Sequence, residues 1–240
     1  MSYLAHRRKA FRGGAYTDDP GTYGLTFDGV AGRVGCGSDS SIANVFDGGG
    51  SMVARIKVAS DGEGDFGRVW DKRDASGSGH TLITLSESAG FCKLRFLQDF
   101  STQDGRWDTT SADVELGTWI TVAVVYNADS ATNDAKIYID GVESSVTEAL
   151  TPSGTRASDI SSNLRLGNLI SDRTFDGVID WVRIYDKELS TVELQDISAL
   201  SGNLVEAWEL EENTGTTTAA EISSPTNDGT LSSSPTWTTV

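Results

Sequence analysis

The feature that most constrains the fold is a series of short segments in which apolar and polar residues alternate. Alternation places the apolar side chains on one face, so each segment predicts a half-buried β-strand. Clusters of Gly, Asp, Asn and Ser separate the segments, and the pair Asp140-Gly141 is typical of a tight hairpin turn. The predicted strands cover residues 23–29, 32–36, 51–58, 66–72, 80–87, 91–98, 118–127, 135–146, 163–169, 175–186, 204–210 and 229–237.

Only residues 190–198 have the pattern of a helix. Ser190 and Glu193 have the spacing of a capping box, which often begins an α-helix. The chain has 240 residues, enough for one all-β domain, and its 26 glycines suit a fold with many turns. We therefore expect an all-β fold of two antiparallel sheets packed face to face, with one short helix.

Charge is distributed unevenly along the chain. The net charge is −16, yet residues 1–14 contain four basic residues and no acidic one. An acidic body argues against nucleic-acid binding, because contacts with phosphate need Lys and Arg. The basic segment lacks the apolar core and the cleavage site of a signal peptide, so we expect residues 1–20 to form a retained basic arm. Its basic residues are Arg7, Arg8, Lys9 and Arg12.

The numbers of cysteines and histidines and the lengths of the apolar runs indicate whether disulfides, a zinc site or a membrane span can be expected. Cys36 and Cys92 both fall in predicted strands, and free buried thiols are the default interpretation, although the sequence leaves their pairing open. With no C-x-x-C pattern and only two histidines, a zinc site is not expected. No apolar run approaches the roughly 20 residues of a membrane span, so we expect no membrane association.

Several spaced motifs resemble those of one family. "YGLTFDGVAGRVGCG" is followed by "SMVARIKV", "LGTWITVAVVYN", "AKIYIDGVE", "NLRLGNL" and "FDGVIDWVRIYDKELSTVEL". In this order, over about residues 23–197, they resemble the laminin G-like / concanavalin A-like lectin–glucanase superfamily, of the kind found in bacteriophage virion proteins. The resemblance implies a jelly-roll sandwich of two curved antiparallel sheets.

The C-terminal segment, residues 204–237, resembles a stretch that opens the domain in many members of that family. Some 40 residues alone could not bury a core. We therefore expect residues 21–240 to form a single domain, in which residues 203–240 close the sheet in a circularly permuted order. A strand donated to a neighbouring subunit is the alternative.

An aspartate, Asp180, interrupts an otherwise apolar predicted strand and has two interpretations. In the first, it lies at a bulge or pairs with Arg183 or another base. In the second, which the resemblance implies, it helps to bind a structural calcium ion, with Asp28 and Asp228 as further ligands. The glycine-rich loop usual in the family is missing here, which counts against calcium. No other cofactor is expected.

Two tryptophans, Trp107 and Trp70, are the candidates for sugar binding. Trp107 is flanked by Asp104, Arg106 and Asp108 in a predicted loop, and Trp70 also precedes charged residues. An indole face beside carboxylates and an arginine can stack on a sugar ring and hydrogen-bond its hydroxyls. The alternative is that both indoles cap the core beneath long loops.

Motifs for catalysis are missing from the sequence. The E-x-D-x-x-E run of sandwich-fold glucanases, which would direct paired carboxylates into one cleft, does not occur. The sequence also lacks a G-x-S-x-G elbow and a phosphate-binding loop. We therefore expect no enzymatic activity.

The arm and the family resemblance together favour a structural virion protein, namely a capsid decoration, head fibre or tail component. Its basic arm would bind other virion proteins, it would form a homo-oligomer in that assembly, and its sandwich would bind host-surface polysaccharide weakly. The alternative is a soluble or secreted bacterial carbohydrate-binding or adhesion module, located outside the cell or on its surface. A polysaccharide-degrading enzyme is a more distant alternative.

Overall fold

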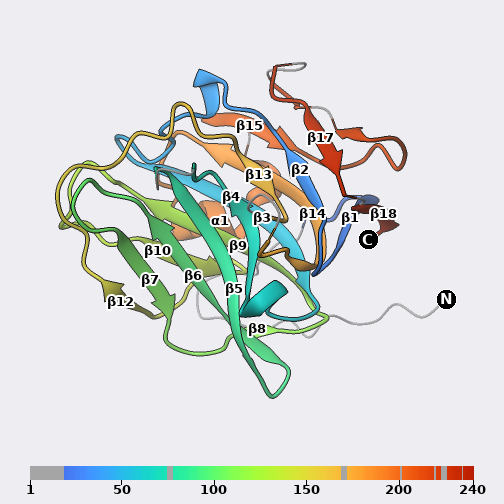
Figure 1. Cartoon of the computed structure of the whole chain (residues 1–240), viewed down its shortest axis with the longest axis horizontal. Helices are drawn as coiled ribbons and strands as arrows, with labels where there is room; N and C mark the ends of the chain where they lie inside the picture. The colour runs from blue at the N-terminus through green and yellow to red at the C-terminus, as the bar shows by residue number, and fades with distance from the viewer. Residues whose placement is uncertain are drawn as a thin grey trace.

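The fold consists of two antiparallel sheets packed face to face, as predicted (Figure 1). The all-β, jelly-roll class with one short α-helix is confirmed. The basic arm, with Arg7, Arg8, Lys9 and Arg12, lies outside the described residues, and its role stays a prediction. A computed structural model describes residues 19–74, 78–168, 172–200, 202–218, 220–222, 226–233 and 235–240.

The first sheet has eight strands and lies at the back in Figure 1. Its strands are β1 (Tyr23–Asp28), β3 (Gly50–Val58), β9 (Trp119–Tyr126), β10 (Lys136–Ile139), β11 (Val142–Glu143), β14 (Asp176–Tyr185), β15 (Leu204–Trp208) and β18 (Thr236–Thr239). Their order is β11-β10-β9-β3-β14-β1-β18, and β15 also pairs with β14.

The second sheet has ten strands and lies in front of the first. Its strands are β2 (Arg33–Gly35), β4 (Phe66–Asp71), β5 (His80–Ser88), β6 (Phe91–Gln98), β7 (Gly105–Thr109), β8 (Val114–Glu115), β12 (Val146–Leu150), β13 (Arg165–Leu166), β16 (Thr217–Thr218) and β17 (Gly229–Ser232). Their order is β12-β7-β6-β5-β4-β13-β2-β17-β16, and β8 pairs with β6.

Alternate side chains of both sheets fill the main core between them. On β6, for example, Leu94 and Phe96 are buried in this core, whereas Lys93 and Arg95, which alternate with them, are half-exposed. Cys36 and Cys92 also lie in the core as free thiols, and burial raises the pKa of Cys92 to about 12. These thiols are therefore protonated side chains that pack as small hydrophobes.

The strand β14 is apolar on both faces because both of its faces are covered. Its inner face belongs to the main core, and on the outer face Trp181 and Tyr185 pack in a second apolar cluster with Leu194. Leu194 comes from helix α1 (Thr191–Gln195), which begins with the predicted capping box of Ser190 and Glu193. The helix therefore covers the eight-stranded sheet.

The C-terminal segment contributes strands to both sheets. β18 pairs with β1, β15 pairs with β14, and β17 pairs with β2. Figure 1 shows the red C-terminal strand β18 beside the blue β1. The described residues contain no helix with the length and apolarity needed to span a membrane. Whether this strand order arose by circular permutation stays a prediction.

Replacing Trp208, on β15, tests how far the C-terminal segment stabilises the core. The Trp208 side chain is fully buried and its Nε1–H donates to the Asn227 carbonyl oxygen at 2.9 Å. We expect Trp208→Ala to lower the free energy of unfolding by about 3–5 kcal/mol in urea denaturation, because it leaves a large cavity. Trp237→Ala should cost less, because Trp237 is only partly buried. Equally small losses for the two variants would contradict this packing.

Candidate functional site

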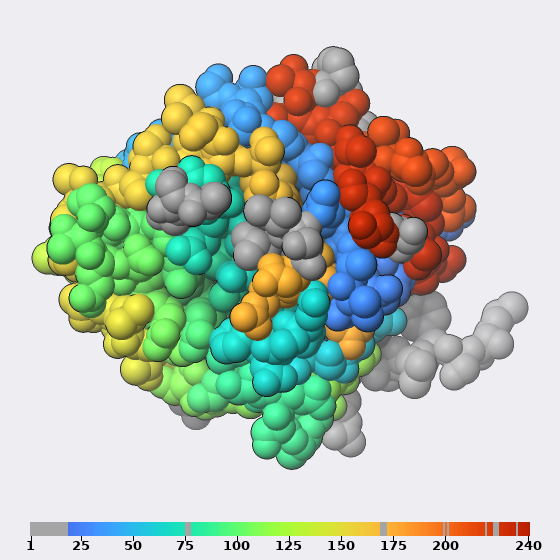
Figure 2. Space-filling model, viewed as in Figure 1, coloured from blue at the N-terminus to red at the C-terminus, as the bar shows by residue number. Residues whose placement is uncertain are grey.

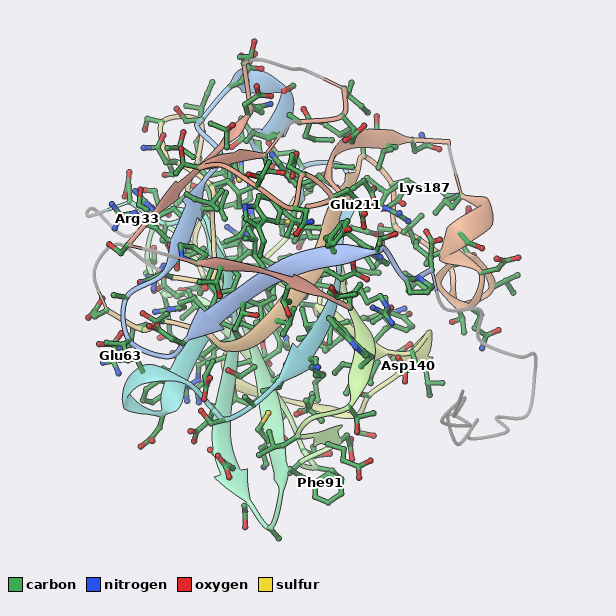
Figure 3. All side chains as sticks on the ribbon, turned by 90° about the vertical axis from the view of Figure 1, so that its right-hand side faces the viewer. Arg33, Glu63, Phe91, Asp140, Lys187 and Glu211 are labelled. Atoms are coloured by element: carbon green, nitrogen blue, oxygen red, sulfur yellow. The ribbon has the colours of Figure 1, made fainter. Side chains whose placement is uncertain are left out.

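The face of the ten-stranded sheet that points away from the core carries many charged side chains. We call this surface the outer face; it consists of the outward side chains of β2, β4, β5, β6, β7, β13 and β17. Figure 2 looks onto it and shows the teal and green residues of β4 to β7 beside the blue β2 and the red β17. In Figure 3, Arg33 and Glu63 lie on this side of the molecule, and Lys187 and Asp140 lie on the opposite side.

The two tryptophans predicted to bind sugar do not reach the outer face. Trp107 lies in strand β7 rather than a loop, and both Trp107 and Trp70 are 0% exposed. The Trp107 ring stacks on Phe96, with 6.0 Å between ring centroids, and its Nε1–H donates to Asp134. The prediction of an exposed stacking face is therefore wrong, because strand alternation turns both indoles into the core. The alternative placed both indoles against the core beneath long loops; they do belong to the core, but they lie in strands β4 and β7.

Two of the three charged neighbours of Trp107 lie on the outer face. Arg106 and Asp108 are half-exposed on either side of the buried indole. Arg95 donates from Nε and Nη2 to the two carboxylate oxygens of Asp108, both at 2.7 Å. Asp104 accepts from the Phe100 backbone N–H at 3.2 Å. These hydrogen bonds hold the Arg95 guanidinium and the two carboxylates in place.

A hollow at the start of β4 has the chemistry expected of a sugar site. Phe66 is half-exposed there, and the guanidinium carbons of Arg173 and Arg95 lie 5.0 and 5.7 Å from its ring centroid. The hollow measures about 390 Å³, within the size range of small-ligand sites. We call it the Phe66 hollow; it is lined by Asp61, Asp65, Phe66, Leu85, Ser86, Glu87 and Arg95.

A tight turn before β4 sets the position of Phe66. Gly62 has a φ of +84°, and a Cβ there would lie 2.5 Å from the Cα of Gly67, so only glycine fits. Glu63 then accepts from both the N–H and the hydroxyl of Thr174, each at 3.0 Å. Phe66 was not among the predicted site residues, although an aromatic residue directly after the turn-forming stretch "SDGEGD" is a signal for one.

A second hollow lies on β2, β13 and β17. It measures about 320 Å³, and two glycines are among the residues that line it. Arg165 on β13 pairs with Gly35 on β2, and Gly35 pairs on its other side with Thr230 on β17. We call it the Arg165 hollow; it is lined by Arg33, Gly35, Gly37, Asn163, Arg165, Thr230 and Ser232.

Two further ion pairs lie on β4 and just after the ends of β4 and β6. Arg73 donates from Nε and Nη2 to the two oxygens of Asp99, at 2.8 and 2.6 Å. Burial raises the pKa of Asp99 to about 7, against the opposing effect of Arg73. Asp71 lies 3.7 Å from Arg68, and burial also raises the pKa of Asp71. These carboxylates are fully buried, so they shape the surface without reaching a ligand.

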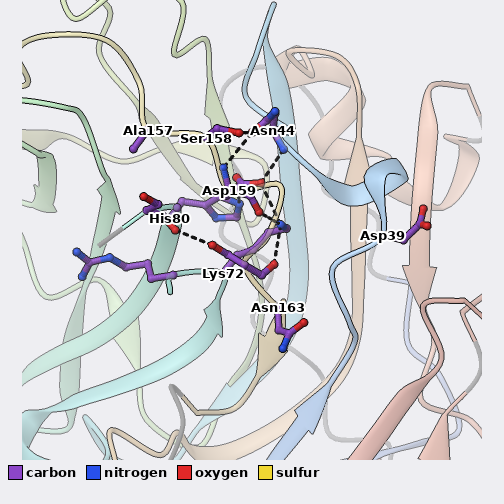
Figure 4. A network of polar contacts seen from close by, with 12 residues as sticks. Asp39, Asn44, Lys72, His80, Ala157, Ser158, Asp159 and Asn163 are labelled. Carbon is purple, nitrogen blue, oxygen red and sulfur yellow. Dashed lines mark hydrogen bonds and ion pairs between the residues drawn. The ribbon is translucent and has the colours of Figure 1, made fainter. Parts of the chain in front are cut away.

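A buried network beneath the outer face fixes the loop that contains Asp159 (Figure 4). The Lys72 ammonium donates to Asp159 Oδ1 at 2.9 Å and to the carbonyl oxygens of Asp159 and Ser162 at 2.7 and 2.9 Å. His80 lies beside it, with Nε2 3.8 Å from Asp159. Removing the Lys72 ammonium and the Asp159 carboxylate from water costs free energy. The three oxygen atoms that accept hydrogen bonds from the ammonium offset part of that cost.

The three predicted calcium ligands lie apart in the structure. Asp180 occupies a bulge of β14, where its Oδ2 accepts from Arg55 at 2.6 Å and from the Gly21 N–H at 3.1 Å. Asp28 lies at the other end of β1 and accepts from two backbone N–H groups of its own turn, and Asp228 accepts from the Ala220 N–H. Asp180 therefore matches its first interpretation, a bulge residue paired with a base.

Metal binding has little support in the described part of the chain. It contains no group of three or more His, Cys, Asp or Glu side chains that could hold a metal ion. Burial raises the pKa of Asp180 to about 6, even though Arg55 acts in the opposite direction. The three predicted residues do not fit one calcium site, because a guanidinium already occupies the most buried carboxylate. Calcium binding stays an untested prediction.

A laminin G-type family model, described as the concanavalin A-like lectin/glucanases superfamily, matches residues 39–195. A search of curated proteins gave no significant match.

Solved structures with a similar fold come from several sources. A Bacteroides ovatus protein proposed to bind carbohydrate has a TM-score of 0.62 and 16% identity, over 93% of this chain and 61% of that one, so this chain spans less than two thirds of its length. A heptameric SAP-like pentraxin from Limulus polyphemus has a TM-score of 0.57 and 13% identity, over 90% and 96% of the two chains. Domain 4 of the extracellular arabinanase AbnA from Geobacillus stearothermophilus, in complex with arabinotriose, has a TM-score of 0.50 and 20% identity, over 76% and 80%. At these identities, the similarity shows the fold alone.

The neutral His80 beneath the outer face predicts a pH dependence of stability. Burial lowers the pKa of His80 to about 4, below the roughly 6.5 of an unfolded chain. The unfolded state then binds the proton more readily, so the free energy of unfolding should fall as the pH drops from about 6.5 to about 4, by up to about 3 kcal/mol.

The matched measurement compares wild type with His80→Gln, which cannot titrate, by urea denaturation across this pH range. Asp99 acts in the opposite direction, because its raised pKa favours the folded state at low pH, but it is common to both proteins. The difference between the two curves therefore reports His80. Parallel curves would contradict a buried neutral imidazole.

Proposed function

Because the chain belongs to the concanavalin A-like lectin/glucanases superfamily, we propose that it is a carbohydrate-binding module without catalytic activity. We place its glycan site on the outer face of the ten-stranded sheet. Two proteins of similar fold support the proposal: one is itself proposed to bind carbohydrate, and the other is a domain in complex with arabinotriose.

The observation that carries the proposal is the Phe66 hollow. Its half-exposed ring offers apolar surface that a sugar ring can contact. The Asp61 carboxylate beside it already accepts from the Glu87 N–H at 3.0 Å, and Arg95 is held by Asp108. These groups can hydrogen-bond sugar hydroxyls without first losing much side-chain freedom.

The ion pairing of the outer face supports a binding role rather than catalysis. A glycoside hydrolase needs one carboxyl group that donates a proton to the substrate and a second one across the scissile bond. Asp99 has the raised pKa of a proton donor, but it is 0% exposed and both of its oxygens are bound by Arg73. Asp108 is likewise bound by Arg95 through both of its oxygens.

An assembly role on a virion stays a prediction, as do a homo-oligomer and a location in the virion or outside the cell. The basic residues on which that role rests lie outside the described residues. If the module is displayed in many copies, weak binding at each open site would still give a high total avidity.

Replacing Phe66 tests the proposed site. A glycan array identifies a ligand for the purified chain, and calorimetry then measures its affinity. We expect Phe66→Ala to weaken binding roughly ten-fold, because it removes this apolar surface. The melting temperature should change little, since the ring is half-exposed.

Phe91→Ala is the matched control, because Phe91 is also an exposed phenylalanine of the same sheet but lies at the β5–β6 hairpin. It should leave the affinity unchanged. Full affinity in Phe66→Ala would place the glycan elsewhere, and an absence of any glycan ligand would reject the function.

A further inference from the structure

Gly35, in the middle of the Arg165 hollow, is a glycine that the backbone does not require. Its φ lies outside the left-handed region, and a Cβ at this position would have the Thr230 carbonyl oxygen as its nearest neighbour, at 3.9 Å. Glycine weakens a strand, and where no steric reason requires it, it often marks a place where a ligand approaches closely. Gly35 therefore weakens the strand, and neither its backbone conformation nor a close neighbour requires a glycine there.

The effect of Gly35 is to open the floor between two arginines. Arg165 and Thr230 are its direct neighbours on the two adjacent strands, and Arg33 precedes it by two residues on the same face. Cross-strand neighbours have Cβ atoms only about 5 Å apart, so any side chain at this position would fill the space between them.

Arg165 lines this space and makes no direct hydrogen bond or ion pair with a carboxylate in the described chain. Its Nη1 donates to the carbonyl oxygens of Arg73 and Asn163, at 3.3 and 3.2 Å, and to no acidic side chain. Burial lowers the pKa of Arg165; the carboxylate of Asp71, its neighbour on β4, opposes this effect, and the nearby charge of Arg33 adds to it. By contrast, Arg95 on the same face binds a carboxylate with two hydrogen bonds. An anion in the hollow would give Arg165 the direct contact that the buried Asp71 carboxylate does not make.

Uncharged polar groups surround the arginines. Thr230, Ser232 and Asn163 contribute hydroxyl and amide groups to the rim of the hollow. Guanidinium groups suit carboxylates and sulfates, and hydroxyls and amides suit the sugar hydroxyls next to them. Because the whole protein has a net charge of −16, it does not attract polyanions in general, so binding of one must come from a local site.

We infer that the Arg165 hollow binds the anionic group of an acidic sugar residue, so that the ligand of this module is an acidic polysaccharide. This inference rests on the proposed function and specifies the class of glycan. The strand β4 carries Phe66 at one end and Asp71, which pairs with Arg165, at the other. A chain that lies along β4 for about 17 Å, at about 3.3 Å per residue, would contact both hollows.

The test compares one polysaccharide with and without its charge. Calorimetry measures the affinity of the chain for a galacturonate oligosaccharide and for its fully methyl-esterified form. A second comparison, of the affinities for dextran sulfate and dextran, shows whether a sulfate can replace the carboxylate. We expect the wild type to bind one acidic form at least ten-fold more tightly than its uncharged partner. Arg165→Gln should lose this preference and keep the affinity for the uncharged form.

A second variant separates binding from folding. Gly35→Val should raise or keep the melting temperature, since valine favours strands, yet lose the preference for the acidic glycan because its side chain fills the hollow. Arg106→Gln, on the same face but outside the hollow, is the matched control and should keep the preference. A loss of stability together with binding in Gly35→Val would contradict the inference.

The outcomes also distinguish this inference from the proposed function. Equal affinity for charged and uncharged glycans, lost only in Phe66→Ala, would overturn the inference and leave the proposed function standing. An acid preference that persists in both Arg165→Gln and Gly35→Val would also overturn it. Failure to bind any glycan would overturn both.

Discussion

The position of β1 between β14 and β18 is the constraint on which the rest of the structure depends. This pairing joins the start of the domain to its last strand and aligns Leu25 with both Ile179 and Trp237. The same return of the chain places β17 against β2, so that Ser232 pairs with Arg33 and Thr230 with Gly35. The Arg165 hollow therefore exists only because the C-terminal strands return to the N-terminal ones.

Local features of the fold could be predicted from the sequence because they depend on neighbours in the chain. Alternation located the strands, the capping box located α1, and Asp140-Gly141 has the two positive φ angles, +49° and +68°, that its hairpin turn requires. The prediction that Trp107 lies in a loop was wrong, and this error also came from its neighbours in the chain. Every outward residue around it is polar, so a short strand looked like a loop, although the alternation of Arg106 and Asp108 around one indole was already visible.

Long-range pairings could not be predicted, because they depend on how strands align across a sheet. Asp180 meets Arg55, 125 residues away, and Lys72 meets Asp159, 87 residues away. The sequence offered Arg183 as an equally good partner for Asp180, but Arg183 binds Asp19 and Glu209 instead. The two hollows are also assembled from segments that lie far apart in the sequence. For the Arg165 hollow, the sequence did contain one signal, a glycine within a predicted strand, Gly35.

The central claim is that ligands bind the outer face of the ten-stranded sheet, opposite the face that α1 covers. Amide chemical-shift mapping by NMR, with a galacturonate oligosaccharide added to the isotope-labelled chain, tests it most directly. The account predicts that the shifts cluster on β2, β4, β13 and β17, with the amides of α1 and β10 unchanged. Shifts that cluster on α1 and β10 instead would contradict it.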